Sequence, residues 1–427
     1  MLIEFVVGIV IFITVFYLII SEKVPGAWAT MIGGLLMALV GITNEEQALE
    51  AVGSKLEILF LLIGMMIIVH YISETGVFQW FAIKVAQIVR GEPFYLIVLL
   101  AVVTALFSAF LDNVTTILLM APVSILLANQ LQQDPFPFVI TEIMAANIGG
   151  VATLIGDPTQ LIIGYEGKLG FNQFLSNTAP VSIIALVILL TNVYFIYGRK
   201  MEVSGDLKAR IMNLDPVRSL KDKQLLKEAG IIFSFVIIGF ILNNFINKGL
   251  AVIALSGAVA LVIIAKKKPE EVFHHVEWDT LFFFIGLFML VKGLDEIHLS
   301  SMVATKLVQL TAGKFELAVL SITWLSTLFT SIIGNVANAA MISQVVKGMI
   351  PSFQDLGNTE IFWWALSFGS CLGGNMTILG SATNVVAVGA ASKAGCKIDF
   401  MKFMKFGALI AIQTVIFSNL YMWIRYF

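Results

Sequence analysis

The chain has 427 residues, of which 59% are hydrophobic and only 13% are charged, and its formal net charge is −2. Soluble domains average about 25% charged residues, so this composition excludes an ordinary soluble protein and a basic nucleic-acid-binding domain. The sequence has no phosphate-binding loop and no dinucleotide fingerprint. We therefore expect neither an enzyme nor an ATP-driven pump within this chain, and no cofactor.

Long apolar runs recur along the whole chain. They cover residues 5–20, 27–43, 58–70, 94–111, 177–197, 229–243, 250–265, 280–291 and 406–424. Many approach the roughly 17–25 residues that cross a bilayer as a helix. The acid Glu4 precedes the first run and the first cation, Lys23, follows it, so we do not expect a cleaved signal peptide. The runs predict an all-α, multi-pass protein of the cell (inner) membrane.

Two polar interruptions stand out in the first half of the chain. The stretch SAFLDNVTTILLMAP (108–122) carries Asp112 and Asn113 in the middle of apolar sequence. The stretch ANIGGVATLIGDPTQ (146–160) is rich in glycine and ends near Asp157. Non-helical backbone at membrane depth is tolerated only where protein or a water-filled cavity satisfies its polar groups. Both stretches therefore predict helix breaks with a functional purpose.

The second half of the chain repeats the first. At an offset of 222 residues, LFLLIG (59–64) returns as LFFFIG (281–286) and LFSAFLDNV (106–114) as LFTSIIGNV (328–336); at an offset of 224, ANIGGVATLIGDPTQ (146–160) returns as SCLGGNMTILGSATN (370–384). Shared residues in register over such a length indicate an internal duplication. We divide the chain into a first repeat (1–197), a linker (198–228) and a second repeat (229–427).

Basic residues predict the orientation. The linker contains eight Lys or Arg residues, and the positive-inside rule places such a segment in the cytoplasm. Lysines 266–268 and the lysines at 393, 397, 402 and 405 are expected on the same side. Each repeat must then cross the membrane an odd number of times, which leaves both termini outside.

Five crossings per repeat are possible only if one apolar segment enters the membrane and returns. We expect residues 94–131 to form this re-entrant hairpin, with its bend at Leu111–Asn113. The second hairpin, about 316–350, bends at Gly334-Asn335 and enters from the opposite face. The predicted fold is thus two inverted repeats with about ten transmembrane helices, two re-entrant hairpins and broken helices, the arrangement in which transporters place substrate and ion sites near the midplane.

The predicted breaks gather hard oxygen ligands and glycines. The substrate- or ion-binding candidates are Asp112, Asn113, Thr115, Thr116, Gly149, Gly150, Thr153, Asp157, Asn335, Asn338, Gly373, Gly374, Thr377, Ser381, Thr383 and Asn384. Carboxylate, amide and hydroxyl oxygens suit protons or hard cations. A Na⁺ ion is expected at Asp112, Asn113, Asp157 and Asn335.

The two repeats differ in charge at these breaks. Gly334 replaces Asp112, and Ser381 replaces Asp157. A carboxylate inside a membrane is costly, and a purely structural repeat gives no reason to keep two of them on one side only. We therefore expect one or both aspartates to carry the coupling proton or cation, without choosing between them.

Structural alternatives remain for several of these residues. Asn113 and Asn335 are also good N-caps for the helices that follow, and the paired glycines also suit close helix packing. His70 and Lys292 occupy equivalent positions in the repeats, where snorkelling is the simpler role. Glu142 is a weaker candidate for a second proton site. We expect His274 and His275, beside the basic run 266–268, to be solvated, and Cys371 to be a packing residue rather than a metalloid ligand.

These motifs resemble the ion transporter superfamily. The residues that carry the resemblance are SAFLDNVTT, ANIGGVATLIGDP, WDTLFFFIGLF (278–288) and CLGGNMTILGSATN. Their pattern is similar to the ArsB and melanosomal P-protein permeases, which are related to NhaD-type sodium/proton antiporters and to divalent anion/sodium symporters. The resemblance implies a scaffold domain and a transport domain, a homodimer and elevator-like movement. Members similar to P protein usually carry Asp-Asn at the second tip, whereas this chain has Gly334-Asn335.

Three functions compete. The first is a secondary active transporter, a proton-coupled antiporter of Na⁺ or of an inorganic solute such as arsenite. The second is sodium-coupled uptake of a di- or tricarboxylate such as citrate, which two site carboxylates would repel unless cations screen it. The third is an ion channel, which dissipates a gradient and cannot concentrate a solute. The resemblance also implies a separate ATPase subunit that could dock on the linker 198–228.

Overall fold

The computed structural model describes residues 2–21, 23–246 and 248–427, and within these residues it contains helices and no strand. The helices of the first repeat are α1 (Leu2–Ile20), α2 (Gly26–Leu39), α3 (Glu45–Gly53), α4 (Leu56–Glu74), α5 (Val77–Ile88), α6 (Pro93–Phe110), α7 (Asn113–Gln130), α8 (Pro135–Val151), α9 (Pro158–Gly167) and α10 (Phe171–Ile196). The linker contains α11 (Gly205–Met212).

The second repeat follows the same order. Its helices are α12 (Lys223–Ile241), α13 (Asn243–Ile246), α14 (Leu250–Ile264), α15 (Pro269–His274), α16 (Trp278–Glu296), α17 (Leu299–Leu310), α18 (Phe315–Ile333), α19 (Asn335–Met349), α20 (Ile361–Gly373), α21 (Ala382–Lys393) and α22 (Phe400–Tyr426). The first residues of α16, α17 and α18 each lie 222 residues after the first residues of α4, α5 and α6, respectively. The duplication predicted from the sequence is therefore confirmed at the level of helices.

The helix breaks fall where the sequence predicts them. The helix α6 ends at Phe110 and α7 begins at Asn113, so the first hairpin turns at Leu111-Asp112. The second hairpin turns at Gly334, between α18 and α19. Residues 152–157 separate α8 from α9, and two short 3-10 turns separate α20 from α21. Both helix breaks and both helix-turn-helix hairpins are thus present, while the re-entrant course of the hairpins in the membrane stays a prediction.

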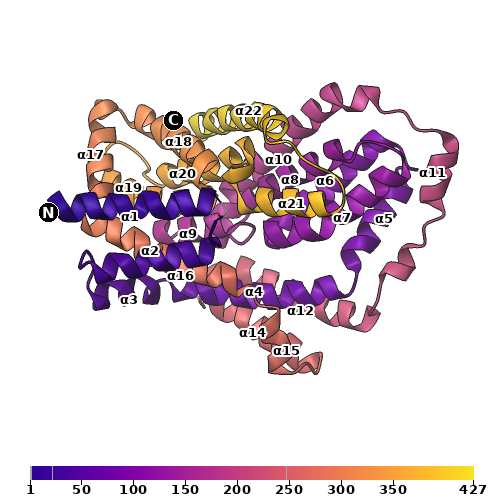
Figure 1. Ribbon diagram of the computed structural model, residues 1–427, viewed down its shortest axis with the longest axis horizontal. Coiled ribbons are helices and arrows are strands. Elements are labelled where there is room, and N and C mark those ends of the chain that lie inside the picture. Colours follow the sequence, from indigo (N-terminus) through magenta and orange to yellow (C-terminus); the bar gives the residue numbers. More distant parts are fainter. Residues whose placement is uncertain (1, 22, 247) are drawn as a thin grey trace.

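The helices form two bundles. In the hairpin bundle, α6 and α7 pack on α8, α18 packs on α20, and α10 and α22 close the group. In the flanking bundle, α2 packs on α16 and α1, and α4 packs on α14 and α12. Figure 1 shows α4, α12 and α14 along the lower edge of the molecule and α10, α18 and α22 along the upper edge, with α9 and α19 between them.

Basic segments gather at one end of the molecule. The Lys402 ammonium lies 3.8 Å from Asp134, Gln133 donates to the carbonyl of Glu202 in the linker, and the Lys221 amide donates to the carbonyl of Thr75. In Figure 1 the linker helix α11 lies at the right end, while both termini lie toward the left. The linker and the two termini thus lie toward opposite ends of the molecule. Which end faces the cytoplasm stays a prediction.

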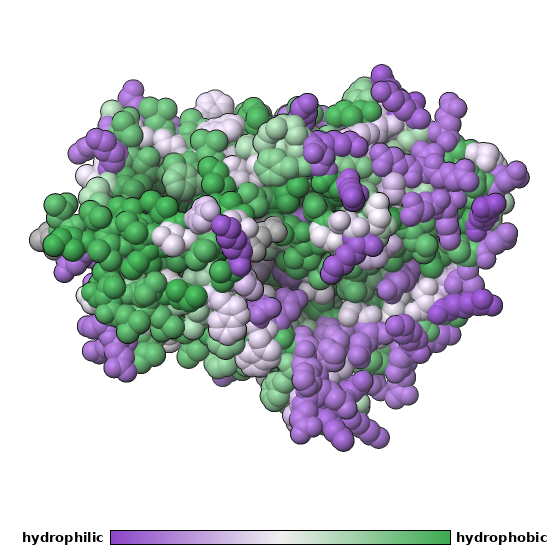
Figure 2. All heavy atoms as spheres, in the orientation of Figure 1, coloured by the Kyte–Doolittle hydropathy of each residue, from purple (hydrophilic) through white to green (hydrophobic). Residues whose placement is uncertain are grey.

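The outer surface is that of a membrane protein. Eight helices are long and apolar enough to span a bilayer within the described residues, and shorter apolar helices accompany them. Large apolar side chains are exposed on α1, α10, α12, α14 and α22. Figure 2 shows apolar residues covering much of the left part of the visible face, with hydrophilic residues gathered at the right end and along the lower edge. Lipid is the solvent that such a surface requires.

Candidate functional site

The first hairpin tip is built around a capping aspartate. Asp112 has an extended backbone, and its Oδ2 accepts hydrogen bonds from the Thr115 amide at 2.9 Å and the Thr115 hydroxyl at 3.2 Å. This is the geometry of an N-cap, which satisfies backbone donors left free at the start of a helix. The alternative in which Asn113 caps α7 is not met, because Asn113 is the first helical residue and its side chain points elsewhere.

A second capping aspartate begins the helix after the break. Asp157 Oδ1 accepts a hydrogen bond from the Thr159 amide at 2.7 Å, and Pro158 occupies the first turn of α9, where its missing N–H costs nothing. The close approach of this break to α6 and to α8 requires Gly156, because a Cβ there would lie 2.7 Å from the Ser108 carbonyl oxygen of α6 and 2.9 Å from the Gly150 carbonyl oxygen of α8. The side chain of Asp157 is fully buried.

Asp157 joins the tips of both hairpins. Its Oδ2 accepts hydrogen bonds from Asn113 at 2.8 Å and from Asn335 at 2.9 Å. Asn113 is 2% exposed and Asn335 is 4% exposed. The two asparagines occupy equivalent positions in the repeats, so one carboxylate of the first repeat holds both hairpins together.

The second repeat has a neutral counterpart. Ser381 caps α21 by accepting a hydrogen bond from the Thr383 amide at 3.3 Å, as Asp157 caps α9. The Ser381 hydroxyl lies 3.3 Å from Asn147 Oδ1. Asn147 in turn donates to Asn375 at 2.8 Å and to Asn384 at 2.7 Å. Ser381 is thus joined to a buried amide network, made of Asn147 of the first repeat and Asn375 and Asn384 of the second, at the position where the first repeat has a carboxylate.

A cavity of about 530 Å³ lies between the two bundles. Of the residues predicted from the sequence, those that line it are Asp112, Asn113, Asp157, Asn335, Ser381 and Thr383. The opposite wall belongs to α1, α2, α4 and the start of α16. The predicted tips and broken helices therefore converge on one hollow.

The sequence reasoning missed two acids in that opposite wall. Glu277 and Asp279, at the start of α16, line the cavity together with Thr280. The Thr115 hydroxyl lies 3.4 Å from Glu277 Oε1, which connects the hairpin tip to the flanking bundle. The available signal was the position of both acids directly before the apolar run 280–291, near the predicted inner face.

Other residues predicted from the sequence lie near the cavity and make hydrogen bonds there without lining it. Thr377 donates to the Ser331 carbonyl at 2.6 Å, Thr153 donates to the Ala109 carbonyl, and Asn338 donates to Ser370 at 2.8 Å. Asn384 donates to the carbonyls of Gly374 and Thr377 at 2.8 Å each. The bonds of Thr377, Thr153 and Asn338 join the broken helices to the hairpins, and those of Asn384 join the two halves of its own broken helix.

The paired glycines serve close packing. A Cβ at Gly149 would lie 2.2 Å from the Ala105 carbonyl oxygen of α6, and a Cβ at Gly373 would lie 2.7 Å from the backbone of Thr327 in α18. A Cβ at Gly150 or Gly374 would approach a carbonyl in the following break at 3.0–3.1 Å. Close contact with a hairpin helix therefore explains Gly149 and Gly373, and close contact with the following break explains Gly150 and Gly374. None of the four lines the cavity.

Glu142 and Cys371 lie inside the hairpin bundle and outside the cavity lining. Glu142 Oε1 accepts hydrogen bonds from Ser124 at 2.7 Å and Thr104 at 3.4 Å, while its Oε2 is buried without a partner. Cys371 is buried and free. The hydrogen bonds of Glu142 stay within the hairpin bundle, whereas Cys371 lies close to Asp157 and Thr159 at the start of α9. The second proton site at Glu142 and the packing role of Cys371 stay predictions.

The cavity wall suits a hard cation. It presents four carboxylates, from Asp112, Asp157, Glu277 and Asp279, and no basic side chain among its lining residues. Beside it, the hydroxyl oxygens of Thr116, Thr159 and Thr383 are buried without a hydrogen-bond partner. Carboxylate and hydroxyl oxygens are ligands for hard cations and acceptors for protons, and they offer nothing to a soft metal.

Known proteins resemble this chain over almost its whole length. The family model described as citrate transporter (CitMHS) matches residues 16–369. A 46 kDa membrane protein of Mycobacterium leprae is 35% identical over 99% of both chains. A protein of Mycobacterium tuberculosis strain H37Rv, named an uncharacterized transporter, is 34% identical over 99% of both chains. The mouse P protein is 30% identical over 96% of this chain and 59% of its own length.

Solved structures share the fold at low sequence identity. The YdaH transporter of Alcanivorax borkumensis superimposes with a TM-score of 0.60 at 13% identity, covering 88% of this chain and 87% of that one. The MtrF protein of Neisseria gonorrhoeae, described as an antimetabolite efflux pump, gives a TM-score of 0.62 at 11% identity over 92% and 84%. The predicted relation to the ion transporter superfamily and to the P protein is confirmed.

Proposed function

The chain belongs to the citrate transporter family of membrane transporters, and from this membership and its acidic cavity we propose that it is a proton-coupled secondary active transporter. The cargo that the site suits is Na⁺ or an uncharged inorganic solute such as arsenite. The observation that carries the proposal is the convergence of four carboxylates on one cavity, with Asp157 held by both hairpin tips. A nucleotide-driven mechanism would need a binding motif that the sequence lacks.

Competition for one carboxylate produces exchange. A carboxylate that binds a proton cannot at the same time bind Na⁺ with its full charge, so each ion displaces the other. Asp112 is the better candidate for this exchange because it is partly exposed and lines the cavity, and it meets Glu277 through Thr115. Asp157 is held by three hydrogen bonds and is the better candidate for fixing the tips.

Alternating access requires the two bundles to move against each other. The cavity lies at their boundary, with the hairpin tips on one wall and α16 on the other. An elevator-like movement of the hairpin bundle along the flanking bundle would carry the tips across the membrane, with a homodimer anchoring the flanking bundles. A separate ATPase subunit at the linker is a further partner under this proposal.

Symport of citrate is the second candidate, favoured by the description of the family model. A bare tricarboxylate would meet four acids and no basic side chain on the cavity wall. Citrate would therefore enter only together with cations that neutralise it. The amides of Asn113 and Asn335 already donate to Asp157, so they would have to exchange partners to hold a citrate carboxylate.

The test is ion flux in liposomes. The purified protein is reconstituted with an interior pH dye and a preset proton gradient, and Na⁺, Li⁺, arsenite, or citrate with and without Na⁺ is added. Proton movement on adding Na⁺ or arsenite, absent in Asp112→Asn, supports the antiporter. Proton movement that occurs only when citrate is added together with cations would instead support the symporter. Flux that cannot drive accumulation against a gradient identifies a channel and overturns the proposal.

A further inference from the structure

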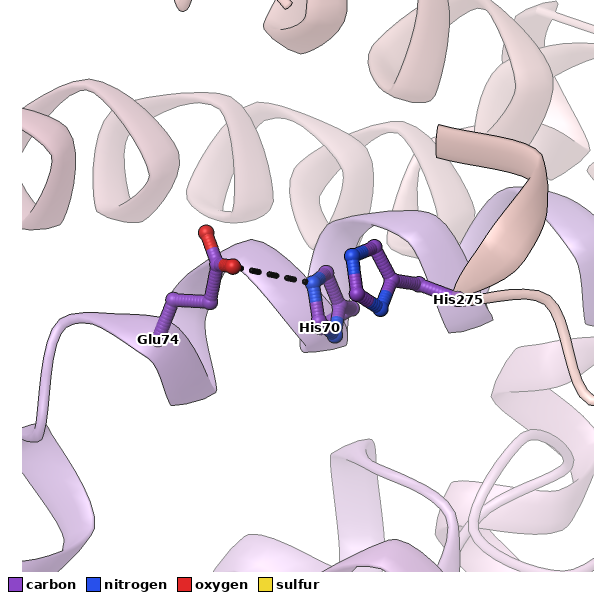
Figure 3. A group of neighbouring side chains, drawn as sticks. All are labelled: His70, Glu74 and His275. Carbon is purple, nitrogen blue, oxygen red and sulfur yellow. Dashed lines mark ion pairs between the residues drawn. The ribbon is translucent and has the colours of Figure 1, made fainter. Parts of the chain in front are cut away.

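Two histidines and a glutamate meet near the end of α4, away from the residues of the transport cavity. His70 and Glu74 lie on consecutive turns of α4, and His275 follows α15 (Figure 3). One ligand atom from each residue lies within 4.8 Å of the other two. The rings of His70 and His275 stack with their centroids 3.6 Å apart and their planes 14° apart.

One nitrogen of this group lacks a hydrogen-bond partner. His70 Nε2 lies 3.4 Å from Glu74 Oε1. This contact is an ion pair when His70 is protonated and is drawn as the dashed line in Figure 3, but the buried nitrogen makes no hydrogen bond. Figure 3 shows His70 directed toward the Glu74 carboxylate, with His275 beside it. An unsatisfied buried nitrogen is costly in a folded protein, so its position calls for a ligand.

The repeat supplies a comparison within the same chain. At the offset of 222 residues, His70 corresponds to Lys292 and Glu74 to Glu296, and these form an ordinary ion pair at 2.8 Å. The position equivalent to His275 is Gly53. A helix end at this place therefore needs only a lysine and a glutamate, and the two-histidine arrangement is an addition found in one repeat.

The stacked rings limit the charge that the group can carry. Two protonated imidazoles at this separation would repel each other, and this repulsion favours the neutral form of the ring, which has a free lone pair. Neutral imidazole is the usual nitrogen ligand of Zn²⁺, Ni²⁺ and Co²⁺, and a carboxylate completes many such sites. Because His275 is exposed, movement of its side chain could bring these ligands together.

The three ligand atoms would have to move only a short distance closer together to bind a metal ion. With metal–ligand bonds of about 2.0–2.2 Å, tetrahedral ligand atoms lie about 3.3–3.6 Å from one another. The present spread of up to 4.8 Å is therefore roughly an ångström too wide. Lys267 lies 3.6 Å from the other carboxylate oxygen of Glu74, Oε2. That contact leaves Oε1 available and would hold the carboxylate in place as an outer partner.

We propose that His70, Glu74 and His275 form a binding site for a divalent transition cation of the Zn²⁺ class. The ion would bridge α4 of the first repeat and the α15–α16 connection of the second, with water in the fourth position. The site is separate from the cavity carboxylates, yet it adjoins the cavity walls: His70 comes one helical turn after the lining residue Met66, and His275 two residues before Glu277. Occupancy would therefore brace the flanking bundle where it borders the cavity.

The test is zinc binding by the full chain, purified in detergent without a histidine tag. The sequence has four histidines, which makes a clean background possible. The double variant His274→Gln, His298→Asn keeps only His70 and His275; Asn is used at 298 because this residue has a left-handed backbone with φ of 60°. Calorimetric titration with ZnCl₂ is expected to give one site per chain in the wild type and in this background.

Each ligand is then removed in that background. His70→Gln and His275→Gln are each expected to weaken zinc binding at least about ten-fold, and zinc should raise the unfolding temperature only where both histidines remain. His275 is exposed, so its variant reports on binding without a risk to folding. The proposal is overturned if the wild type shows no saturable binding up to about millimolar zinc, if binding survives loss of both histidines, or if His274→Gln alone abolishes it.

Discussion

Asn113 and Asn335 occupy equivalent positions in the two repeats, and both donate a hydrogen bond to the same oxygen of Asp157. The two repeats therefore have equivalent asparagines at their hairpin tips, but only the first repeat supplies the carboxylate that binds both tips. One carboxylate of the first repeat accepts from both tips, while its counterpart Ser381 bonds within a neutral amide network. Any ion that changes the charge of Asp157 acts on both hairpins at once.

Asp157→Asn should disrupt the hydrogen bonds that join the two hairpin tips to Asp157. The new amide group would face either the two asparagine donors or the Thr159 amide, which also donates, so one contact places donor against donor in a buried site. We expect the free energy of unfolding to fall by about 1–3 kcal/mol and transport to be lost. Asp215→Asn is the matched control, because Asp215 also precedes a proline and also caps the amide two residues on, but in the linker. An unchanged melting temperature in Asp157→Asn would show that the hydrogen bonds of Asp157 to the two hairpin tips do not stabilise the fold.

Asp112→Asn should separate capping from coupling. Asn is as good an N-cap as Asp, so the Thr115 amide keeps its acceptor and the unfolding temperature should stay close to that of the wild type. The group that exchanges a proton for a cation is lost, so proton flux driven by Na⁺ should fall to the background of empty liposomes. Asp222→Asn, which alters a cap of the same i to i+3 geometry at α12, is expected to transport normally. Retained coupling in Asp112→Asn would make Asp112 a purely structural residue.

The sequence predicted the fold because the duplication left in-register matches at the helix breaks. The bends at Asp112 and Gly334 and the interruptions before Asp157 and Ser381 are local features, which turn and capping residues mark directly. The fixed offset then assigned an equivalent helix to each segment. The order of the helices and the positions of their breaks therefore follow from local sequence signals and the repeat.

The partners within the site could not be read in this way. Asn113 and Asp157 are 44 residues apart and Asn335 and Asp157 are 178 apart, so only packing brings them together. Glu277 and Asp279 precede an apolar run and looked like the polar start of a helix. Asn147 stands beside the glycines of its motif, and only the fold shows that it bonds Asn375 and Asn384.

Removing the acids of the flanking wall should weaken cation binding without unfolding the protein. Glu277→Gln with Asp279→Asn lowers the negative charge facing the hairpin tips, and we expect the apparent KM for the transported cation to rise about ten-fold or more. Glu57→Gln is the control, because Glu57 is the repeat counterpart of Asp279 and does not line the cavity. Flux is measured against cation concentration; equal KM values for the double variant and the control would exclude these acids from the site.

Gly334→Ala should strain the second tip. Gly334 has φ of 86° and ψ of 154°, a region that essentially only glycine occupies. A Cβ would meet the Leu379 carbonyl oxygen at 3.6 Å, an ordinary contact, so the cost of about 1–3 kcal/mol comes from the backbone alone. This conformation also explains why the second tip has Gly-Asn instead of Asp-Asn. Gly389→Ala, in α21 with open space around it, should be neutral or stabilising. Equal thermal stability of the two variants would contradict the explanation.

A buried ion pair joins the two bundles at the end opposite the linker. Glu166, at the end of α9, has a side chain that is 3% exposed, and the Lys55 ammonium at the start of α4 lies 2.8 Å from it. Lys347 of α19 also pairs with Glu166, and Gln344 donates to it at 3.2 Å. The Tyr165 hydroxyl donates to the Ser54 carbonyl, so two adjacent contacts cross the same boundary. Movement of the hairpin bundle along the flanking bundle would have to break both.

Lys55→Gln should therefore lower stability and change transport together. Glu166 would keep Lys347 and Gln344, so we expect the loss to stay near ~2 kcal/mol, below the ~3–5 kcal/mol of a buried charge left alone. Combining Lys55→Gln with Glu166→Gln should cost less than the sum of the single variants, because the second change removes the charge that the first one left unpaired. Arg218→Gln, which removes an exposed pair with Asp215, is expected to leave the unfolding temperature unchanged. If the losses in the free energy of unfolding caused by Lys55→Gln and Glu166→Gln are additive, the pair does not connect the bundles energetically. If they are not additive and flux is altered, the pair is a contact that favours the present arrangement of the two bundles.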